Sequence, residues 1–274
     1  MKTIIIAEIG ENHYGRWDVC RGMVEEVAQG GAHYAKFQTY TAEQFGQGHV
    51  WYGEFKKVEM PEAVHFEMQA LCRERGVGFL CSTFTQRSTA FLVDRMGCGE
   101  LKLASSRVTD LALLDYVNSR SDQVRRVYLS TGMSTLEEVG QAVARLDAIT
   151  ELYLLHCTSQ YPTEDENVNL RAMVTLQEAF PDCPVGYSDH SRGIEACLTA
   201  VALGAVGLEK HFTYHPRMPG DDHEGALTPE TLAELVRGVE RVERILGSTE
   251  KRPVEAEERA LRALRVDMHE VGFD

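Results

Sequence analysis

The chain has 274 residues, of which 43% are hydrophobic and 26% are charged, so it is long enough for one large or two modest globular domains. Its formal net charge of −14 argues against binding to nucleic acid or to an anionic membrane surface, because both need a basic patch. The apolar run at residues 4–7 is too short for a signal peptide or a membrane span, and we expect a cytoplasmic protein.

Short apolar runs recur along the chain, and longer segments with helical spacing lie between them. The strand candidates are residues 3–8, 33–38, 77–83, 100–105, 126–131, 152–158, 184–190 and 205–211. The clearest helix candidates are residues 18–31, 60–76, 134–146, 194–204 and 227–247. This alternation and length predict an α/β fold, a (β/α)8 TIM barrel over residues 1–247, with an open doubly wound sheet as the alternative.

Helix ends and two irregular segments complete this prediction. Ser134 with Glu137 indicates a capping box, and Thr228 before a proline indicates the start of the last helix. Residues 39–59 are an overlong connection rich in glycine and aromatic residues, which predicts a loop over the barrel mouth. Residues 248–274 are charged and too short for a domain, so we expect a C-terminal tail or a packing helix.

Polar residues end every predicted strand, where barrels of this kind carry their chemistry. They include Glu8, Lys36, Gln38, Ser82, Thr83, Lys102, Ser105, Ser130, Ser159, Tyr161, Ser188, Asp189, His190, Glu209, Lys210 and His211. Because His190 and His211 end neighbouring strands, their imidazoles can converge on one ion. Two imidazoles with carboxylates or water suit Mn, Fe, Co or Zn better than Mg, although the pair can also be ordinary core histidines.

Lys36 and Lys102 follow apolar runs, where an unpaired charge is costly. Either Glu8 and Glu209 neutralise them, or a phosphate and a carboxylate of a substrate do. In the second case, serine and threonine hydroxyls at the same strand ends would complete an anion site.

Sequence blocks in order along the chain resemble the sialic acid synthase family. They are AEIGENHYG (7–15), KFQT (36–39), CST (81–83), KLAS (102–105), LSTGM (129–133), LLHCTSQYPT (154–163), GYSDHS (186–191), LEKHFT (208–213) and PGDDH (219–223). The resemblance implies that the barrel binds phosphoenolpyruvate and a divalent metal, manganese first, with magnesium or cobalt as alternatives. It also implies condensation of phosphoenolpyruvate with an aldose or N-acyl-hexosamine to a 2-keto-3-deoxy acid, with release of phosphate.

The same resemblance implies a role for each matching residue. Glu8, Lys102, His190 and His211 would be catalytic, with the two histidines holding the metal. The substrate-binding residues would be Lys36, Gln38, Thr83, Ser105, Arg107, Ser130, Ser159, Tyr161, Ser188, Glu209 and Asp222.

Two departures from the family pattern affect the acceptor. Arg107 stands where the family has an acidic residue that holds acceptor hydroxyls, so it indicates either an anionic acceptor or a salt bridge to a neighbouring residue. The family also carries a C-terminal antifreeze-like domain that reaches over the partner subunit; the sequence ends at Asp274, and we expect the barrel domain only, with a homo-oligomer left open. Two alternatives remain: a metal-dependent sugar aldolase or isomerase that does not use phosphoenolpyruvate, and a non-catalytic sugar-binding homologue.

Overall fold

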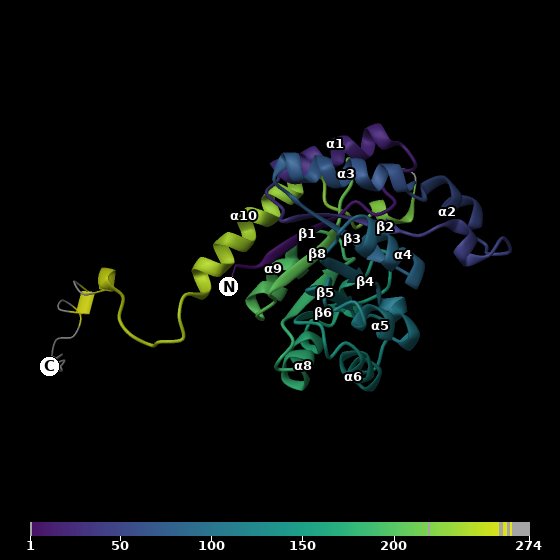
Figure 1. Cartoon of the computed structure of the whole chain (residues 1–274). Coiled ribbons are helices and arrows are strands. Elements are labelled where there is room, and N and C mark those ends of the chain that lie inside the picture. Colours follow the sequence, from purple (N-terminus) through teal and green to yellow (C-terminus); the bar gives the residue numbers. More distant parts are fainter. Residues whose placement is uncertain (1, 219, 258–259, 262–263, 265–274) are drawn as a thin grey trace, which may run out of the picture.

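The computed structural model describes residues 2–218, 220–257, 260–261 and 264, and its central feature is a closed barrel of parallel strands (Figure 1). The strands are β1 (Ile4–Glu8), β2 (Tyr34–Thr39), β3 (Gly78–Thr83), β4 (Glu100–Leu103), β5 (Arg126–Ser130), β6 (Glu151–Cys157), β7 (Val185–Asp189) and β8 (Gly207–His211). Each strand pairs with the next, and β8 closes the barrel on β1 with Glu8 beside His211. The predicted (β/α)8 TIM barrel is confirmed.

Helices connect the strands and surround the barrel in Figure 1. They are α1 (Trp17–Gln29), α2 (Tyr52–Val58), α3 (Glu62–Arg75), α4 (Gln86–Ala90), α5 (Leu111–Asn118), α6 (Leu136–Arg145), α7 (Asp165–Val168), α8 (Arg171–Ala179), α9 (Glu195–Ala202) and α10 (Pro229–Leu246). Short 3-10 turns cover Ala42–Phe45, Ser105–Arg107, Asp221–His223 and Glu255–Glu257, and a π turn covers Phe91–Arg95. The sequence analysis did not single out α5 or α8, which are only two to three turns long and therefore give a weak periodic signal.

The start of α6 corrects one detail of the prediction. Ser134 donates a hydrogen bond to the Gly132 carbonyl (3.2 Å) and is not the cap. Thr135 has the extended backbone of an N-cap and accepts from Glu138 N, while the Glu138 carboxylate accepts from Thr135 N (2.7 Å). The capping box is therefore one residue later than predicted. The predicted start of α10 is confirmed, because the Thr228 side chain caps that helix.

Strand side chains alternate between the inside and the outside of the barrel, as the pleat of a β-strand requires. The lower part of the interior is a packed cluster of Ile6, Leu80, Tyr128, Tyr153 and Leu155. Ile6, Leu80 and Tyr128 lie on the same faces of their strands as Glu8, Ser82 and Ser130, each two positions later, so the interior becomes polar toward the C-terminal ends of the strands. The larger apolar core fills the layer between the strands and the helices.

An ion pair fixes the outer faces of β7 and β8. Lys210 donates to Asp189 Oδ2 (2.6 Å) and to the Ser191 carbonyl (2.5 Å), and both charged residues are almost completely buried. The other oxygen of Asp189 accepts from the Tyr187 hydroxyl (2.9 Å) and from Ser191 N (2.8 Å). Every charge in this pair is matched by a close partner, which marks it as a structural contact between the barrel and its outer layer.

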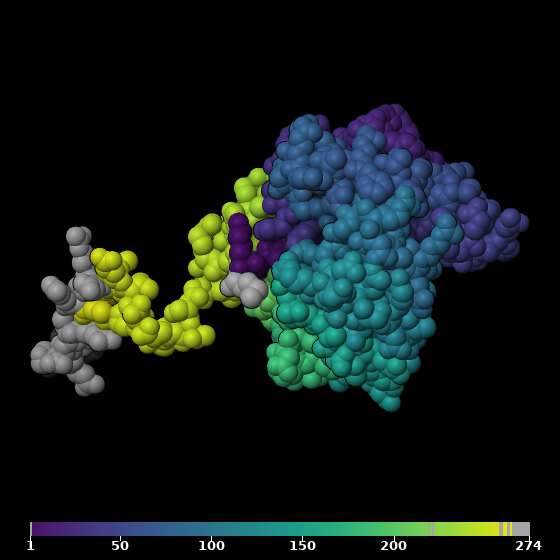
Figure 2. Space-filling model, in the orientation of Figure 1, coloured from purple at the N-terminus to yellow at the C-terminus, as the bar shows by residue number. Residues whose placement is uncertain are grey.

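Residues 39–59 depart from a simple loop because they contain the turn Ala42–Phe45 and helix α2. Figure 2 shows this segment as a lobe that projects from the body of the barrel. At the other end of the molecule, residues 247–257, which follow α10, lead away from the barrel (Figure 1). No helix among the described residues is long and apolar enough to cross a membrane.

Candidate active site

A cavity of about 380 Å³ lies at the C-terminal ends of the barrel strands and is called the inner cavity here. It is lined by Ser82, Phe84, Cys157 and all of the predicted site residues except Thr83 and Arg107: Glu8, Lys36, Gln38, Lys102, Ser105, Ser130, Ser159, Tyr161, Ser188, His190, Glu209, His211 and Asp222. Its volume suits a small ligand. The barrel therefore brings together residues that are up to about two hundred positions apart in the chain.

Two lysines and two glutamates form the charged floor of the inner cavity. Lys36 Nζ lies 2.9 Å from Glu8 Oε2 and 3.6 Å from Glu209 Oε1, and Lys102 Nζ lies 3.8 Å from the same Glu209 oxygen. Lys36 is 3% exposed and Lys102 is 2% exposed, so water cannot solvate their ammonium groups. The structure agrees in part with both predicted partners of these lysines. Glu8 and Glu209 lie beside the ammonium groups, and the cavity leaves room for an anionic ligand as well.

The lysine pKa values differ because the two ammonium groups have different partners. Burial alone lowers the pKa of Lys36, but Glu209 and Glu8 outweigh it and raise that pKa. Burial lowers the pKa of Lys102, which Glu209 only partly opposes. The pKa of Glu209 is lowered, since Lys102 and Lys36 together overcome the effect of its burial. Lys102 is therefore the less well compensated cation, and an added anion would stabilise its charged form.

Four buried atoms around the inner cavity have no hydrogen-bond partner among the described residues: Glu8 Oε2, which has only its ion-pair contact with Lys36, and Ser130 Oγ, Glu209 Oε2 and His211 Nδ1. Buried polar atoms are almost always satisfied, and exceptions gathered at one place indicate a site for a ligand or ion. Ser188 already donates to Glu209 (3.2 Å), and Ser105 accepts from Gly132 N (3.0 Å). The free hydroxyl of Ser130 is the one best placed to serve a ligand.

His190 and His211 lie side by side, with ring centroids 5.5 Å apart. His190 Nδ1 donates to the Thr158 carbonyl (2.8 Å), so Nε2 carries the free lone pair when the ring is neutral. Burial lowers the pKa of His190, but Cys157 and the Thr158 carbonyl outweigh burial and raise that pKa. Burial lowers the pKa of His211 to about 3, so its imidazole is neutral at physiological pH and can also act as a ligand. His211 Nδ1 lies 3.6 Å from Asp222 Oδ2.

A very small cavity of about 10 Å³ lies against these rings and is lined by Tyr161, Pro162, His190, His211, Asp222 and Gly225. A space of this size holds about one water-sized species. The described part of the chain contains no group of three or more His, Cys, Asp and Glu side chains that could hold a metal ion by itself. The two imidazoles fit a divalent ion as a partial donor set that water or substrate oxygen must complete.

Thr83 and Arg107 do not fit the roles predicted for them. Thr83 lies on the outer face of β3, where its hydroxyl contacts Ser88 (2.8 Å) and Thr89 (2.9 Å) in α4. Its neighbour Ser82 points inward and accepts a hydrogen bond from Lys36 (3.0 Å). Arg107 pairs with Asp110 (3.3 Å), which is the salt-bridge alternative of the two that the sequence left open.

Cys157 lines the inner cavity but was not among the predicted site residues. It ends β6 on the inner face, with Sγ 3.8 Å from His190 Nδ1 and 3.6 Å from Ser105 Oγ. Burial raises the pKa of this thiol, but His190, Ser105 and Lys102 together outweigh burial and lower that pKa. Alternation along the strand, with Tyr153 and Leu155 inside, is the signal that could have identified it.

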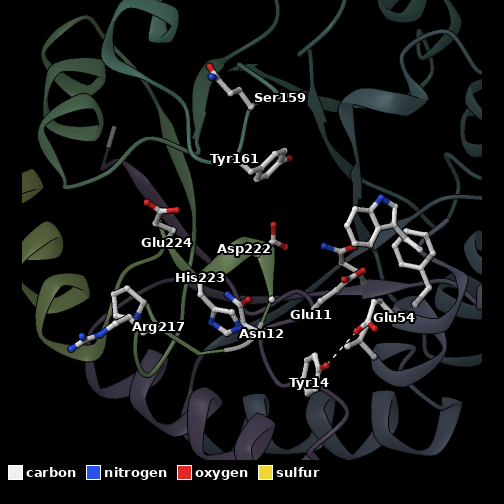
Figure 3. Close-up of a pocket in the computed structure, with 17 residues that line it drawn as sticks. Glu11, Asn12, Tyr14, Glu54, Ser159, Tyr161, Arg217, Asp222, His223 and Glu224 are labelled. Atoms are coloured by element: carbon white, nitrogen blue, oxygen red, sulfur yellow. Dashed lines mark hydrogen bonds between the residues drawn. The ribbon is translucent and has the colours of Figure 1, made fainter.

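A second, larger cavity of about 1180 Å³ continues outward from the first and is called the outer chamber here (Figure 3). The two cavities share Gln38, Ser159, Tyr161 and Asp222. The other residues of the outer chamber are Glu11, Asn12, Tyr14, Trp51, Glu54, Phe55, Val58, Gln160, Pro216, Arg217, Gly220, His223 and Glu224. The lobe at residues 39–59 forms one wall, in line with the prediction that this segment lies over the barrel mouth.

Comparison with known proteins identifies the family. The model described as NeuB family matches residues 23–251. The chain belongs to the NeuB family. This confirms the resemblance to sialic acid synthases that the sequence blocks indicated.

Three relatives illustrate the range of this family. The chain is 35% identical to the N,N'-diacetyllegionaminic acid synthase of Legionella pneumophila, over 94% of this chain and 77% of the relative. It is 36% identical to the human N-acetylneuraminate-9-phosphate synthase, over 90% of this chain and 72% of the relative. The crystal structure of the Leptospira borgpetersenii N-acetylneuraminic acid synthetase in complex with citrate superposes with a TM-score of 0.90 at 32% identity, covering 96% of this chain and 91% of that one.

Proposed function

We propose that this chain is a phosphoenolpyruvate-dependent synthase that condenses phosphoenolpyruvate with an aldose to a 2-keto-3-deoxy acid. A bond forms between the methylene carbon of phosphoenolpyruvate and the aldehyde carbon of the sugar. Water adds to the carbon that carries the phosphate, and phosphate leaves as that C–O bond breaks. Membership of the NeuB family and the names of its relatives support this reaction class.

The observation that carries the proposal is the floor of the inner cavity. Lys36 and Lys102 are buried there within 4 Å of Glu209, yet Ser130 Oγ and Glu209 Oε2 still lack partners among the described residues. A small ligand that brings a phosphate and a carboxylate would neutralise the second lysine and accept from the free hydroxyl. Phosphoenolpyruvate has both groups on three carbons.

The chain's own residues would then divide the work. Lys36, Lys102, Ser130 and Ser188 hold the phosphate and carboxylate of phosphoenolpyruvate. Glu8 accepts a hydrogen bond from Gln38 Nε2 (3.0 Å) and lies 2.9 Å from Lys36. It acts as the general base that accepts a proton from the attacking water. Tyr161 and Asp222 line both cavities and orient the acceptor between them.

His190 and His211 would hold a divalent ion, with manganese as the first candidate and magnesium or cobalt as alternatives. Such an ion supplies Lewis-acid polarisation of the aldehyde oxygen. The neutral His211 imidazole and the free Nε2 of His190 are the donors that this assignment needs.

Phosphate release measured with phosphoenolpyruvate, Mn²⁺ and a panel of aldoses, N-acyl-hexosamines and their phosphates tests the proposal. Release should require phosphoenolpyruvate, metal and one acceptor together. A thermal shift in the presence of Mn²⁺ should show stabilisation by phosphoenolpyruvate, about 2.7 kcal/mol when phosphoenolpyruvate stands a hundredfold above its dissociation constant. Absence of both signals would favour an aldolase, an isomerase or a non-catalytic sugar-binding protein.

A further inference from the structure

The two histidines proposed to hold the metal are fixed in different ways. His190 is hydrogen bonded at both its ring and its backbone by the connection after β6, residues 158–163, which is called the 158–163 turn here. His211 Nδ1 has no hydrogen-bond partner among the described residues and lies 3.6 Å from Asp222 Oδ2. The position of the His190 ring therefore depends on the shape of the 158–163 turn.

Both ends of the turn contact His190. The Thr158 carbonyl accepts from His190 Nδ1 (2.8 Å), and Thr163 N donates to the His190 carbonyl (3.0 Å). Thr163 also forms a parallel bridge with Ser191, the residue after His190. Between the two ends, the Tyr161 ring lies against the His190 ring, with centroids 4.1 Å apart. The turn thus contacts the imidazole at its Nδ1 edge and on one face, and it holds the backbone of the same residue.

The hydroxyl of Thr163 closes the turn. It donates to the Gln160 carbonyl (2.8 Å) and lies 3.3 Å from the Thr158 carbonyl, which is the oxygen that accepts from His190. Thr163 is 2% exposed, so water cannot replace these contacts if the hydroxyl is removed. Loss of the hydroxyl would leave the Thr158 carbonyl free to shift, and the His190 ring with it.

The orientation of this ring matters for metal binding. A histidine that binds a metal through one nitrogen is oriented by the hydrogen bond that its other nitrogen makes. With Nδ1 held by the Thr158 carbonyl, Nε2 is the nitrogen left to bind an ion. Rotation of the ring would move Nε2 relative to His211, across the small cavity that both histidines line.

We propose that Thr163 is a positioning residue for metal binding, because it holds the 158–163 turn in the shape that presents His190 Nε2 to the ion. This inference rests on the proposed function, since it takes His190 and His211 as the metal pair. Thr163 lines none of the three cavities described above. Its effect on the metal must therefore pass through His190.

Calorimetric titration of Mn²⁺ into the substrate-free protein tests this role. Thr163→Val keeps the shape of the side chain and removes the hydroxyl. Affinity for Mn²⁺ should fall about threefold to tenfold, less than the roughly 10- to 100-fold lost with a direct partner of a metal ligand. Thr163→Ser keeps the hydroxyl and should bind Mn²⁺ as the wild type does. The matched control is Thr131→Val: Thr131 is also buried and donates to a β6 carbonyl, that of Leu155 (3.1 Å), but lies outside the turn.

Three results would overturn the inference: unchanged Mn²⁺ affinity in Thr163→Val, an equal loss in Thr131→Val, or a loss in Thr163→Ser as large as in Thr163→Val. The last two would indicate a general effect of altered packing. If Thr163→Val does not fold, Thr158→Val decides. The partly exposed Thr158 hydroxyl donates to the Asn167 carbonyl (2.9 Å) and so holds the start of the same turn. Its loss should weaken Mn²⁺ about twofold to fivefold, and unchanged affinity would contradict the inference.

Phosphate release by the wild type reports separately on the proposed function. If the wild type binds Mn²⁺ but no sugar supports release, the proposed reaction fails, and the Mn²⁺ titrations still decide the inference. If release is normal and Thr163→Val binds Mn²⁺ as tightly as the wild type, only the inference fails. Absence of Mn²⁺ binding by the wild type would overturn both the assignment of the histidines and the inference.

Discussion

The two faces of strands β7 and β8 carry similar residues arranged in opposite ways. On the outer face, Asp189 and Lys210 are in contact at 2.6 Å and are hydrogen bonded on all sides. On the inner face, Glu209 lies 3.6 to 3.8 Å from two lysines, and one of its oxygens has no partner among the described residues. The outer pair is complete without a ligand, whereas the inner cluster is not, and this difference separates a structural charge from a functional one.

The largest expected effect concerns the outer face. Asp189→Ala would leave Lys210 buried without a counter-charge, and we expect a loss of about 3 to 5 kcal/mol in the free energy of unfolding. Urea denaturation measures this loss. Asp18→Ala is the matched control, because Asp18 pairs with Arg16 at 2.7 Å in an exposed position, where solvent screens the pair, and its loss should be much smaller. Similar losses in both variants would contradict a structural role for the outer pair.

Removing an inner histidine should reduce metal binding and leave stability almost unchanged, whereas Asp189→Ala reduces stability. His211→Ala should weaken Mn²⁺ binding by more than the roughly 10- to 100-fold that loss of an outer-shell partner costs, with little effect on folding. The control is His156→Ala: this outward-facing ring contacts the Val168 carbonyl (2.9 Å) and should affect stability without changing metal affinity. Titration of Mn²⁺ followed calorimetrically distinguishes the two. Normal Mn²⁺ affinity in His211→Ala would remove its assigned role.

The sequence predicted where the strands lie better than it predicted which side chains face the inside of the barrel. Apolar runs defined the strands to within two residues, because each strand is buried on both sides and bounded by turn residues. The faces were harder to assign at CST, since Ser82 and Thr83 are adjacent hydroxyls and only the barrel register decides which one points inward. The pairing of Lys36 with Leu80 on β3 places Ser82 inside.

The outer chamber was largely beyond the sequence. Glu11, Trp51 and Glu54 come from the segments that follow β1 and β2, whose paths depend on packing against other connections, and no periodic pattern marks these residues. Arg107 illustrates the same limit, since the turn Ser105–Arg107 carries its side chain away from the inner cavity to Asp110. Sequence patterns therefore predicted most of the residues that line the inner cavity and few of those that line only the outer chamber.

A third comparison replaces a lysine by methionine once inside the barrel, at Lys102, and once on its outer face, at Lys210. Lys102→Met should weaken phosphoenolpyruvate about tenfold to a hundredfold, because it removes a charge-assisted contact worth about 1.5 to 3 kcal/mol. It should not reduce stability: burial lowers the pKa of Lys102, so the protonated amine disfavours folding below that pKa. Lys210→Met should destabilise the fold and leave phosphoenolpyruvate affinity unchanged in the folded protein.

Titration with phosphoenolpyruvate measures the affinity of both variants for it, and urea denaturation measures their free energies of unfolding. If Lys102→Met weakened the acceptor as much as phosphoenolpyruvate, the lysine would not belong to the phosphate site. If Lys210→Met were as stable as the wild type, the complete hydrogen bonding of the outer pair would not be what holds β7 to β8.

The smallest effect tests the face assignment at CST itself. Ser82→Ala removes a hydroxyl that accepts from Lys36 (3.0 Å), and a net hydrogen-bond contribution of about 0.5 to 1.5 kcal/mol predicts a KM for phosphoenolpyruvate raised about twofold to tenfold. Thr83→Val keeps the shape but removes the contacts to Ser88 and Thr89, so it should lower stability and leave that KM unchanged. A higher KM in Thr83→Val with a normal KM in Ser82→Ala would mean that β3 is shifted by one residue in solution, with Thr83 inside the barrel and Ser82 outside.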